Sequence, residues 1–388
     1  MKLHKKKHPA PPRDEATAPA VEPEDGESAA LKSAATSGPA IARSILAWYG
    51  SSHRDLPWRR TSDPYHVWVS EIMLQQTTVK TATPYFEAFI ESYPTAQALA
   101  RAPLDDVLSR WSGLGYYTRA RNLHRAAGIV VSEFDGRVPD EPGALGSLPG
   151  IGDYTRAAIL SIAFEKPHPV VDGNVIRVLS RLAGWKGDPK SPMLKRRVAH
   201  LAEALIPKNS PGDYNQGLME LGATVCKPRQ ADCRLCPLSD FCAARDSGSP
   251  EQYPGVAKQP RPIQTVYGMV LLRESDLYYM VKRDTSGMLK EFWEFPGVEM
   301  PAKTEAPDRV VNDHVQEALQ CSMSLGDQAI EARHSIMNRR ITVRAWPATV
   351  TSGRPQGGEW ISKDSFKDYP ISTMCLKILR KFESQRTA

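Results

Sequence analysis

The amino-acid sequence predicts a two-domain protein, in which an all-helical domain closed by a metal-binding loop precedes a smaller α+β domain. Three observations predict this. Apolar residues recur every three or four positions through most of residues 41–245, which is the period of amphipathic helices. Four cysteines with the spacing C-x6-C-x2-C-x5-C lie at the end of that region, in residues 226–242. Strand-like runs are frequent in residues 264–388, after a segment at 246–263 with the composition of an exposed linker.

The first 40 residues are rich in Pro, Ala, Ser and charged groups and poor in large apolar groups. Such a segment buries too little apolar surface to offset the entropy of ordering, so we expect residues 1–40 to form a disordered tail. Its basic start, KLHKKKH, suits contact with phosphate groups, although a solvated tail without a specific role is the simpler interpretation. The formal net charge of +6 permits nucleic-acid binding without establishing it.

The elements follow from local patterns. Helical periodicity, with Pro, Gly or Asp at the joins, predicts helices in residues 41–52, 64–93, 102–113, 117–134, 152–164, 174–185 and 194–206. Beyond the linker, alternating or continuous apolar runs predict strands in residues 265–273, 277–283, 339–346 and 357–362, with a helix near 307–320. No run of about 18 apolar residues is present, so we expect no membrane span.

The cysteine spacing predicts a metal site. The four thiols of the motif belong to Cys226, Cys233, Cys236 and Cys242, and only two other cysteines occur in the 388 residues. Because the sequence has no apolar signal segment, we expect a reducing cytosol, where disulfides are the weaker interpretation. Spacing alone leaves two centres open, a cubane iron–sulfur cluster or one tetrahedral zinc ion.

Two further motifs precede the cysteines. In LPGIGDYTRAAI, Gly150 and Gly152 form a tight turn that opens onto a helix N-terminus, whose free backbone N–H groups can bind an anion. An ordinary turn between helices is the alternative interpretation of the same residues. In PVVDGNVIRV, Asp172 directly precedes another helix, where capping of the peptides of Asn174 and Val175 is the plain interpretation.

In this order, the LPGIG hairpin, the VDGNV aspartate and the cysteine loop resemble the helix-hairpin-helix DNA glycosylases of the endonuclease III superfamily. RDLPWR at 54–59, VWVSEIMLQQT at 67–77, GLGYYTRARNL at 113–123 and YNQGLMELGA at 214–223 are similar to one branch, the MutY family of adenine glycosylases. The resemblance covers residues 41–245. It implies that the four cysteines hold a [4Fe–4S] cluster, and it is the resemblance that favours the cluster over zinc.

Glu71 is the candidate general acid. It lies among Trp68, Ile72 and Met73, and burial there raises the pKa of a carboxyl toward the neutral range that suits proton donation. A structural, hydrogen-bonded glutamate is the alternative. The resemblance assigns to Glu71 the protonation of an adenine ring nitrogen and the handling of the attacking water. It also makes Asp172 the second carboxylate, which stays ionised and stabilises the oxocarbenium-like sugar.

The residue at position 154 distinguishes a glycosylase that also cleaves the DNA strand from one that only removes the base. Lyases of the endonuclease III type carry a lysine in the hairpin, whose amine forms a Schiff base with the sugar, and this sequence has Tyr154 there. Without an amine, the resemblance implies a monofunctional glycosylase that leaves an abasic site. The tyrosine is also compatible with simple packing at the start of a helix.

A base inside a duplex must leave the stack before a buried acid can reach it. Gln76 and Tyr116 resemble the residues that enter the duplex and fill the gap, although both also suit an ordinary helix surface or loop. By the same resemblance, Asn174 positions Asp172 and the two hairpin glycines bind a phosphate. The residues expected to form the adenine pocket are Arg54, Leu56, Trp58, Arg59, Gln216 and Met219. Lys227, Arg229 and Arg234 in the cysteine loop would face phosphates if that loop lies on DNA, and plain surface charges are the alternative.

Residues 264–388 resemble the Nudix-like domain that recognises 8-oxoguanine opposite the adenine in this family. The glutamate-rich REx2EE helix that binds magnesium in Nudix hydrolases is missing from the sequence after FPG, so we expect a recognition domain and not a second enzyme. Where the family typically has Phe-Ser-His, this sequence has Ile336, Met337 and Asn338. This difference leaves open whether these three residues contact 8-oxoguanine as the family's residues do.

The resulting prediction is a monomeric base-excision-repair glycosylase of the bacterial cytosol or nucleoid. Its expected partner is double-stranded DNA with adenine opposite 8-oxoguanine or guanine, and no membrane. One alternative is a glycosylase that removes thymine from guanine:thymine mispairs, against which Glu71 and the C-terminal domain argue. A non-catalytic DNA-binding or redox-sensing iron–sulfur protein is the other, and the presence of both Glu71 and Asp172 argues against it.

Overall fold

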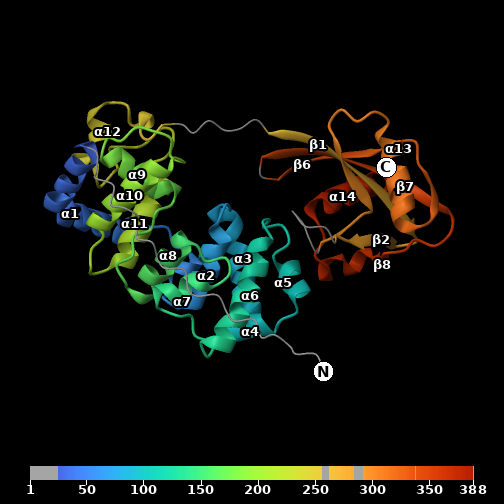
Figure 1. The fold of residues 1–388 in the computed structure, drawn as a ribbon, viewed down its shortest axis with the longest axis horizontal. Helices are drawn as coiled ribbons and strands as arrows, with labels where there is room; N and C mark the ends of the chain where they lie inside the picture. Colours follow the sequence, from blue (N-terminus) through green and yellow to red (C-terminus); the bar gives the residue numbers. More distant parts are fainter. Residues whose placement is uncertain (1–24, 256–261, 284–291, 337, 388) are drawn as a thin grey trace, which may run out of the picture.

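A computed structural model describes residues 25–255, 262–283, 292–336 and 338–387. The helical part of the chain and the part built around a sheet form two lobes (Figure 1). In the described residues, no helix combines the length and the apolar character that a membrane crossing requires.

The helical lobe has two hydrophobic cores. The first core lies among the central helices and buries Trp68 and Trp111 completely. Its elements are η1 (Pro57–Arg59), α2 (Pro64–Leu74), α3 (Val79–Ser92), α4 (Ala96–Arg101), α5 (Leu104–Arg110), α6 (Thr118–Glu133), α7 (Pro142–Ser147) and α8 (Asp153–Phe164).

The second core is formed by the first helix of the described chain and by the helices that follow α8. Leu179, Val198 and Leu221 are completely buried in it. Its elements are α1 (Asp25–Ser52), α9 (Gly173–Leu182), α10 (Pro192–Leu205) and α11 (Pro211–Thr224). The cysteine loop follows α11 and contains η2 (Ser239–Phe241), and α12 (Ala243–Asp246) and η3 (Pro250–Gln252) come next.

The predicted tail at residues 1–40 is wrong in its second half, because α1 already begins at Asp25. The segment DGESAALKSAA is rich in strong helix formers, which favour continuing the helix upstream of the apolar stripe. Packing adds to this preference, since α1 contacts α10 and α11 and Gly38 is buried against Leu205. Residues 1–24, with the basic KLHKKKH segment, lie outside the described residues.

The predicted linker at 246–263 is also too long. Arg181 Nε donates a 3.0 Å hydrogen bond to the Tyr253 carbonyl, Lys186 Nζ lies 5.3 Å from the Tyr253 ring centroid, and Pro254 is buried. These contacts attach residues up to 255 to the helical lobe. The first strand begins at Ile263, and residues 256–261 lie outside the described part of the chain.

The predicted helix at 64–93 is divided into α2 and α3 by a turn at 75–78. Gln76 has a left-handed backbone with φ 58°. The Thr78 hydroxyl accepts a 3.3 Å hydrogen bond from Thr81 N and so caps α3. Threonine side chains compete with the helix ladder in this way, and periodicity over the whole segment conceals the break.

The C-terminal lobe contains an eight-stranded mixed sheet with a helix on each face. Met269 and Leu271 pack on the side of α14, whereas Val270 and Leu272 pack on the side of α13, as the two-residue period of a strand requires. The strands are β1 (Ile263–Glu274), β2 (Leu277–Lys282), β3 (Trp293–Glu294), β4 (Gly297–Pro301), β5 (Ser322–Leu325), β6 (Ile330–Ile336), β7 (Arg339–Ser352) and β8 (Gly358–Ser362), and the helices are α13 (Pro307–Leu319), η4 (Lys363–Asp368) and α14 (Thr373–Thr387).

The sequence identified β1, β2, β7, β8 and α13 but not β3 to β6 or α14. Strand β1 pairs in parallel with β7 from Ile263↔Arg339 to Leu272↔Ala348 and antiparallel with β4. The undetected strands β3, β4 and β5 have at most five residues, which is too short for an alternating pattern to stand out.

The two lobes meet at α5 and at the loop that follows it. The Phe292 ring packs into the first core with its centroid 3.9 Å from that of Tyr117. Ser112 Oγ donates a 3.4 Å hydrogen bond to the Ile371 carbonyl, and Lys282 Nζ lies 3.3 Å from Asp105 Oδ2. The C-terminal lobe therefore contacts the loop that carries Tyr116.

Candidate active site

A pocket of about 190 Å³ lies where the two helical cores meet. Glu71 reaches it from α2 of the first core, and Asp172 reaches it from the N-terminus of α9 in the second core. All six residues that we expected around the base line the same pocket, together with Tyr154 and Asn174. Those six are Arg54, Leu56, Trp58, Arg59, Gln216 and Met219.

Glu71 is 5% exposed. Burial raises the pKa of its carboxyl, and the charge of Asp172 adds to this increase. A 2.6 Å hydrogen bond from the Tyr154 hydroxyl to Glu71 Oε2 and the positive charge of Arg59 act in the opposite direction. The outcome is a pKa of about 7, so Glu71 is half protonated near neutral pH. Burial therefore raises the pKa of Glu71, as its apolar neighbours in the sequence predicted.

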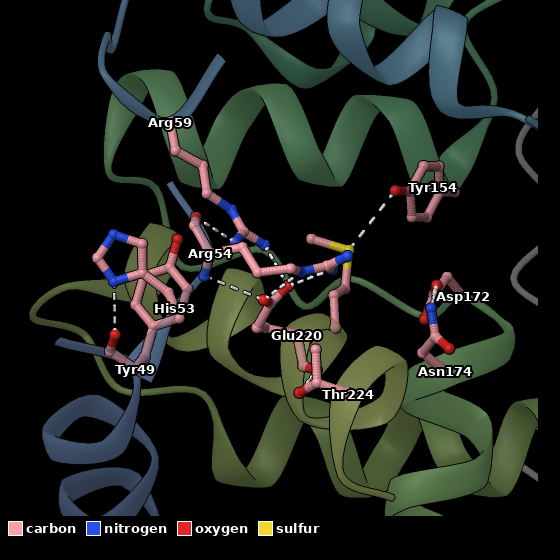
Figure 2. A network of polar contacts seen from close by, with 10 residues as sticks. Tyr49, His53, Arg54, Arg59, Tyr154, Asp172, Asn174, Glu220 and Thr224 are labelled. Atoms are coloured by element: carbon pink, nitrogen blue, oxygen red, sulfur yellow. Dashed lines mark hydrogen bonds and ion pairs between the residues drawn. The ribbon is translucent and has the colours of Figure 1, made fainter. Parts of the chain in front are cut away.

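Tyr154 stands on the first turn of α8, after the LPGIG turn. Gly150 has φ +84°, and a Cβ on it would lie 2.8 Å from Asn122 Cβ, so only glycine suits the position. Burial and the charge of Glu71 raise the pKa of the Tyr154 hydroxyl, which therefore remains a donor. Its oxygen also lies 3.5 Å from Met219 Sδ (Figure 2). The sequence did not predict the bond to Glu71.

Asp172 caps α9. Its Oδ1 accepts a 2.7 Å hydrogen bond from Val175 N, and its Oδ2 accepts a 2.9 Å bond from Asn174 Nδ2 (Figure 2). Burial raises the pKa of Asp172, whereas these hydrogen bonds act against the increase. A Cβ on Gly222 would lie 2.5 Å from Asn174 Cβ, so this glycine lets α11 approach Asn174. The predicted contact between Asn174 and Asp172 is present.

Glu220 is a pocket residue that sequence analysis missed. Its side chain is 1% exposed, and its oxygens lie 2.6 Å from Arg54 Nε and 2.8 Å from Arg59 Nη2 (Figure 2). Burial alone would raise the pKa of Glu220, but the two arginines outweigh it and lower that pKa to about 2. Gln216, which was expected at the pocket, and Glu220 are four residues apart and therefore lie on the same face of a helix. This spacing could have indicated that Glu220 also lines the pocket.

Gln76 and Tyr116 lie outside this pocket, at a cleft of about 510 Å³ between the helical and C-terminal lobes. Both have left-handed backbones, with φ 58° and 50°, and Tyr116 is 36% exposed. The opposite wall includes Ile336 at the end of β6. Met337 lies outside the described residues, whereas Asn338 is exposed and its carbonyl accepts a 2.8 Å hydrogen bond from Ile263 N.

Cys226, Cys233, Cys236 and Cys242 line one further pocket. Arg181, which is buried on α9, donates hydrogen bonds to Cys226 Sγ at 3.3 Å and to the Lys227 carbonyl at 2.8 Å. A buried guanidinium that donates to one of four thiols in a shared pocket suits an anionic metal–thiolate centre. Among the described residues, no three His, Cys, Asp or Glu side chains are arranged to hold a single metal ion. Lys227, Arg229 and Arg234 are exposed on this loop.

Comparison with known proteins gives two family matches. Residues 69–204 match the HhH-GPD superfamily of base excision DNA repair proteins, and residues 267–381 match the NUDIX domain. These matches confirm the predicted fold class of a helix-hairpin-helix glycosylase domain followed by a Nudix-like α+β domain.

Among individual proteins, the adenine DNA glycosylase of Rattus norvegicus is 34% identical over 89% of this chain and 78% of its own length. That of Mycolicibacterium smegmatis is 41% identical over 56% of this chain and 76% of its own length. A solved structure of a thermostable thymine-DNA glycosylase, 31% identical, aligns with a TM-score of 0.50 over 55% of this chain and 98% of its own. The match to the Rattus protein therefore covers more of this chain than the match to the thymine-DNA glycosylase does.

Proposed function

This chain belongs to the adenine DNA glycosylase family, and from that premise we propose that it hydrolyses the N-glycosidic bond of adenine opposite 8-oxoguanine or guanine in duplex DNA. One observation supports the chemistry most directly. A single pocket holds a buried carboxyl with a pKa of about 7 and a second buried carboxyl on the N-terminus of another helix. Such a pair supplies a proton donor and a carboxylate to an oxocarbenium-like reaction.

In this mechanism, protonated Glu71 donates its proton to a ring nitrogen of the extruded adenine. The C1′–N9 bond then breaks, and its electron pair leaves with the base, which departs neutral. Water adds to C1′ of the sugar cation and gives a proton back to the Glu71 carboxylate. The Tyr154 hydroxyl, 2.6 Å from Glu71 Oε2, holds that carboxylate in place through both steps.

Asp172 is proposed to face the sugar as a carboxylate. Its two oxygens already accept hydrogen bonds from Val175 N and Asn174 Nδ2, which orient the group and favour its charged form. A developing positive charge at C1′ adds a further attraction that is strongest in the transition state. Asp172 thus contributes electrostatic stabilisation and does not itself transfer a proton.

The product is proposed to be an intact strand with an abasic site. No lysine is present among the described residues that line the pocket, and Tyr154 occupies the hairpin position where a lyase has its amine. A buried phenol with a raised pKa is a poor nucleophile toward the sugar. Strand cleavage therefore requires alkali or another enzyme.

The cleft between the lobes is proposed to receive the base opposite the adenine. Gln76 and Tyr116 on one wall would enter the duplex, and Ile336 with its neighbours on the other wall would contact 8-oxoguanine. Residues 336–338 offer different side-chain chemistry from Phe-Ser-His, so recognition would rest more on Asn338 and on shape. Duplex DNA is the proposed partner, and a monomer in the bacterial cytosol stays a prediction.

We further propose that the four cysteines hold a [4Fe–4S] cluster. Each of the four thiolates would bind one iron of such a cluster. The four cysteines line one pocket, and the buried guanidinium of Arg181 donates a hydrogen bond to Cys226 Sγ, which suits an anionic cluster held by thiolates. Iron and sulfide analysis of purified protein tests it, with about four of each per chain expected. Zinc in place of iron would contradict it.

The decisive experiment is single-turnover base release from three duplexes, with alkali added afterwards to reveal abasic sites. The duplexes contain adenine opposite 8-oxoguanine, adenine opposite guanine, and thymine opposite guanine. We expect adenine release to be fastest opposite 8-oxoguanine, with breaks only after alkali. Thymine release would favour the second candidate, which the similarity to a thymine-DNA glycosylase motivates. Release of neither base would contradict both.

A further inference from the structure

Arg119 on α6 is a buried cation whose hydrogen bonds all go to uncharged oxygens. It is 9% exposed, and the described residues place carbonyl and hydroxyl oxygens around it instead of a carboxylate. Burial lowers the pKa of its guanidinium to about 10, which still leaves it charged at neutral pH. A buried charge without a counter-ion is costly unless many dipoles solvate it, so its position calls for an explanation.

One set of these bonds is made with the end of α2 and the turn after it. Nη1 donates to the carbonyls of Ile72 at 2.8 Å, Met73 at 2.9 Å and Gln75 at 2.5 Å. Nη2 donates to Thr77 Oγ1 at 3.2 Å. Cations favour helix C-termini, where the last carbonyls have no partner within the helix. Arg119 thus caps α2 and fixes the residues on both sides of Gln76.

The second set is made with the loop at 114–116. Nη2 donates to the carbonyls of Leu114 at 3.3 Å and Gly115 at 3.0 Å, and Nε donates to that of Tyr116 at 3.4 Å. The guanidinium carbon also lies 5.4 Å from the centroid of the Tyr116 ring. One planar group therefore joins the two segments that carry Gln76 and Tyr116.

Both of these residues have left-handed backbones, which non-glycine residues keep only when their surroundings hold them. Without Arg119, at least six oxygens of the two segments would lose a donor. The turn and the loop would then be free to adopt ordinary backbone conformations. Their side chains would no longer be held in place at the cleft.

We propose that Arg119 is a positioning residue that holds Gln76 and Tyr116 in the arrangement needed to open the duplex, and that it does not take part in breaking the glycosidic bond. The inference depends on the proposed glycosylase function and on the proposed entry of those two side chains into DNA. It predicts a defect confined to base extrusion.

The test compares Arg119→Lys with the unmodified protein on two substrates under single-turnover conditions. Lysine keeps the charge, but one ammonium group cannot reach both segments. On adenine paired with 8-oxoguanine, we expect release to slow by about tenfold to a hundredfold, from loss of several hydrogen bonds. On adenine opposite an abasic-site analogue, where no base pair has to open, we expect a change below about threefold.

Two further measurements separate this role from a general structural one. The Tyr116→Ala change should mask the Arg119→Lys effect, so that the double variant loses no more activity than Tyr116→Ala alone. The alkaline limb of the pH–rate profile should stay where it is, because Glu71 is untouched. Arg125→Lys, the same substitution at an exposed position of α6, serves as the control and should behave like the unmodified protein.

Equal losses on both substrates, additive losses with Tyr116→Ala, or unchanged release would each overturn the inference. If Arg119→Lys fails to fold, Thr77→Val removes one acceptor with a smaller perturbation. It should slow release by about threefold on adenine paired with 8-oxoguanine and leave release opposite the abasic-site analogue unchanged. Failure of the unmodified protein to release adenine from any duplex would instead reject the proposed function.

Discussion

Glu71 owes its chemistry to the residues that surround it and not to its place in the sequence. Trp68, Ile72 and Met73 are neighbours on α2, so the sequence revealed the burial that raises the pKa of Glu71. The sequence did not reveal the hydrogen bond from Tyr154, which lies 83 residues away. Long-range contacts of this kind depend on how α2 and α8 pack.

The rate of adenine release should depend on pH through Glu71. The protonated acid is the active form, so activity is full below its pKa and falls as the pH rises through about 7. A pH series of single-turnover rates measures this limb. Glu71→Gln should reduce the rate by about 10²- to 10⁴-fold at every pH while the protein still binds mispaired DNA. A Gln variant with the original rate would remove Glu71 from the mechanism.

Tyr154→Phe should shift the alkaline limb of the pH–rate profile to higher pH. The phenol donates to the Glu71 carboxylate and thereby lowers its pKa, so removing the hydroxyl raises the pKa and extends the active form to higher pH. One hydrogen bond to a charged group corresponds to a shift of about one pH unit. The measurement is the same pH series, and a limb that moves downward would show that Tyr154 acts on Glu71 in another way.

At the scale of elements, Glu220 joins α11 to the segment that leads from α1 into η1. Its buried carboxylate pairs with Arg54 and Arg59, so a substitution affects α11, η1 and the segment before η1 at once. The sequence indicated that the two arginines lie at the pocket, but no local pattern indicates their partner, which is more than 160 residues away.

Glu220→Gln should therefore destabilise the protein. The change leaves Arg59 buried without its counter-charge, which costs about 3 kcal/mol. Urea unfolding followed by circular dichroism gives the free energy of unfolding. The matched control is Asp55→Asn, which breaks an exposed pair with Arg60 and should leave the unfolding midpoint unchanged. Equal midpoints for both variants would show that the buried pair does not stabilise the fold.

Element boundaries show the limits of periodicity. The pattern at 64–93 continues through a turn that divides it, and Thr78 caps a new helix directly after that turn. In α1 the reverse happens, since the weakly apolar residues 25–40 continue the helix upstream, favoured by their helix-forming composition and by packing of α1 on α10 and α11. The local sequence predicted most of the longer helices but not α4, α7, α11 or α14, and tertiary contacts decided where the predicted helices begin and end.

At the scale of the whole molecule, the contact between the lobes connects the C-terminal domain to the loop of Tyr116. Phe292 is completely buried against Tyr117 in a core that otherwise belongs to the helical lobe. The sequence predicted two domains, but no local pattern indicates that a side chain of one completes the core of the other.

Phe292→Ala should weaken the discrimination between opposite bases. Removing the ring loosens the C-terminal lobe from the 112–117 loop, so we expect the ratio of rates opposite 8-oxoguanine and opposite guanine to fall by about tenfold. Adenine release opposite guanine should change little. Phe292→Leu, which retains most of the apolar volume, should keep the ratio. A proportional loss on both duplexes after Phe292→Ala would argue against a selective role for this contact.

The pocket between the two helical cores takes one of the two carboxyl groups of the proposed mechanism from each core. Glu71 is anchored in one core and Asp172 in the other, so no single helix sets the gap across which the reaction takes place. That gap depends on every side chain that separates the cores. Natural variants that reduce repair should therefore be found well beyond the residues that touch DNA, along an internal boundary where a small misfit slows the enzyme while the protein remains folded and abundant.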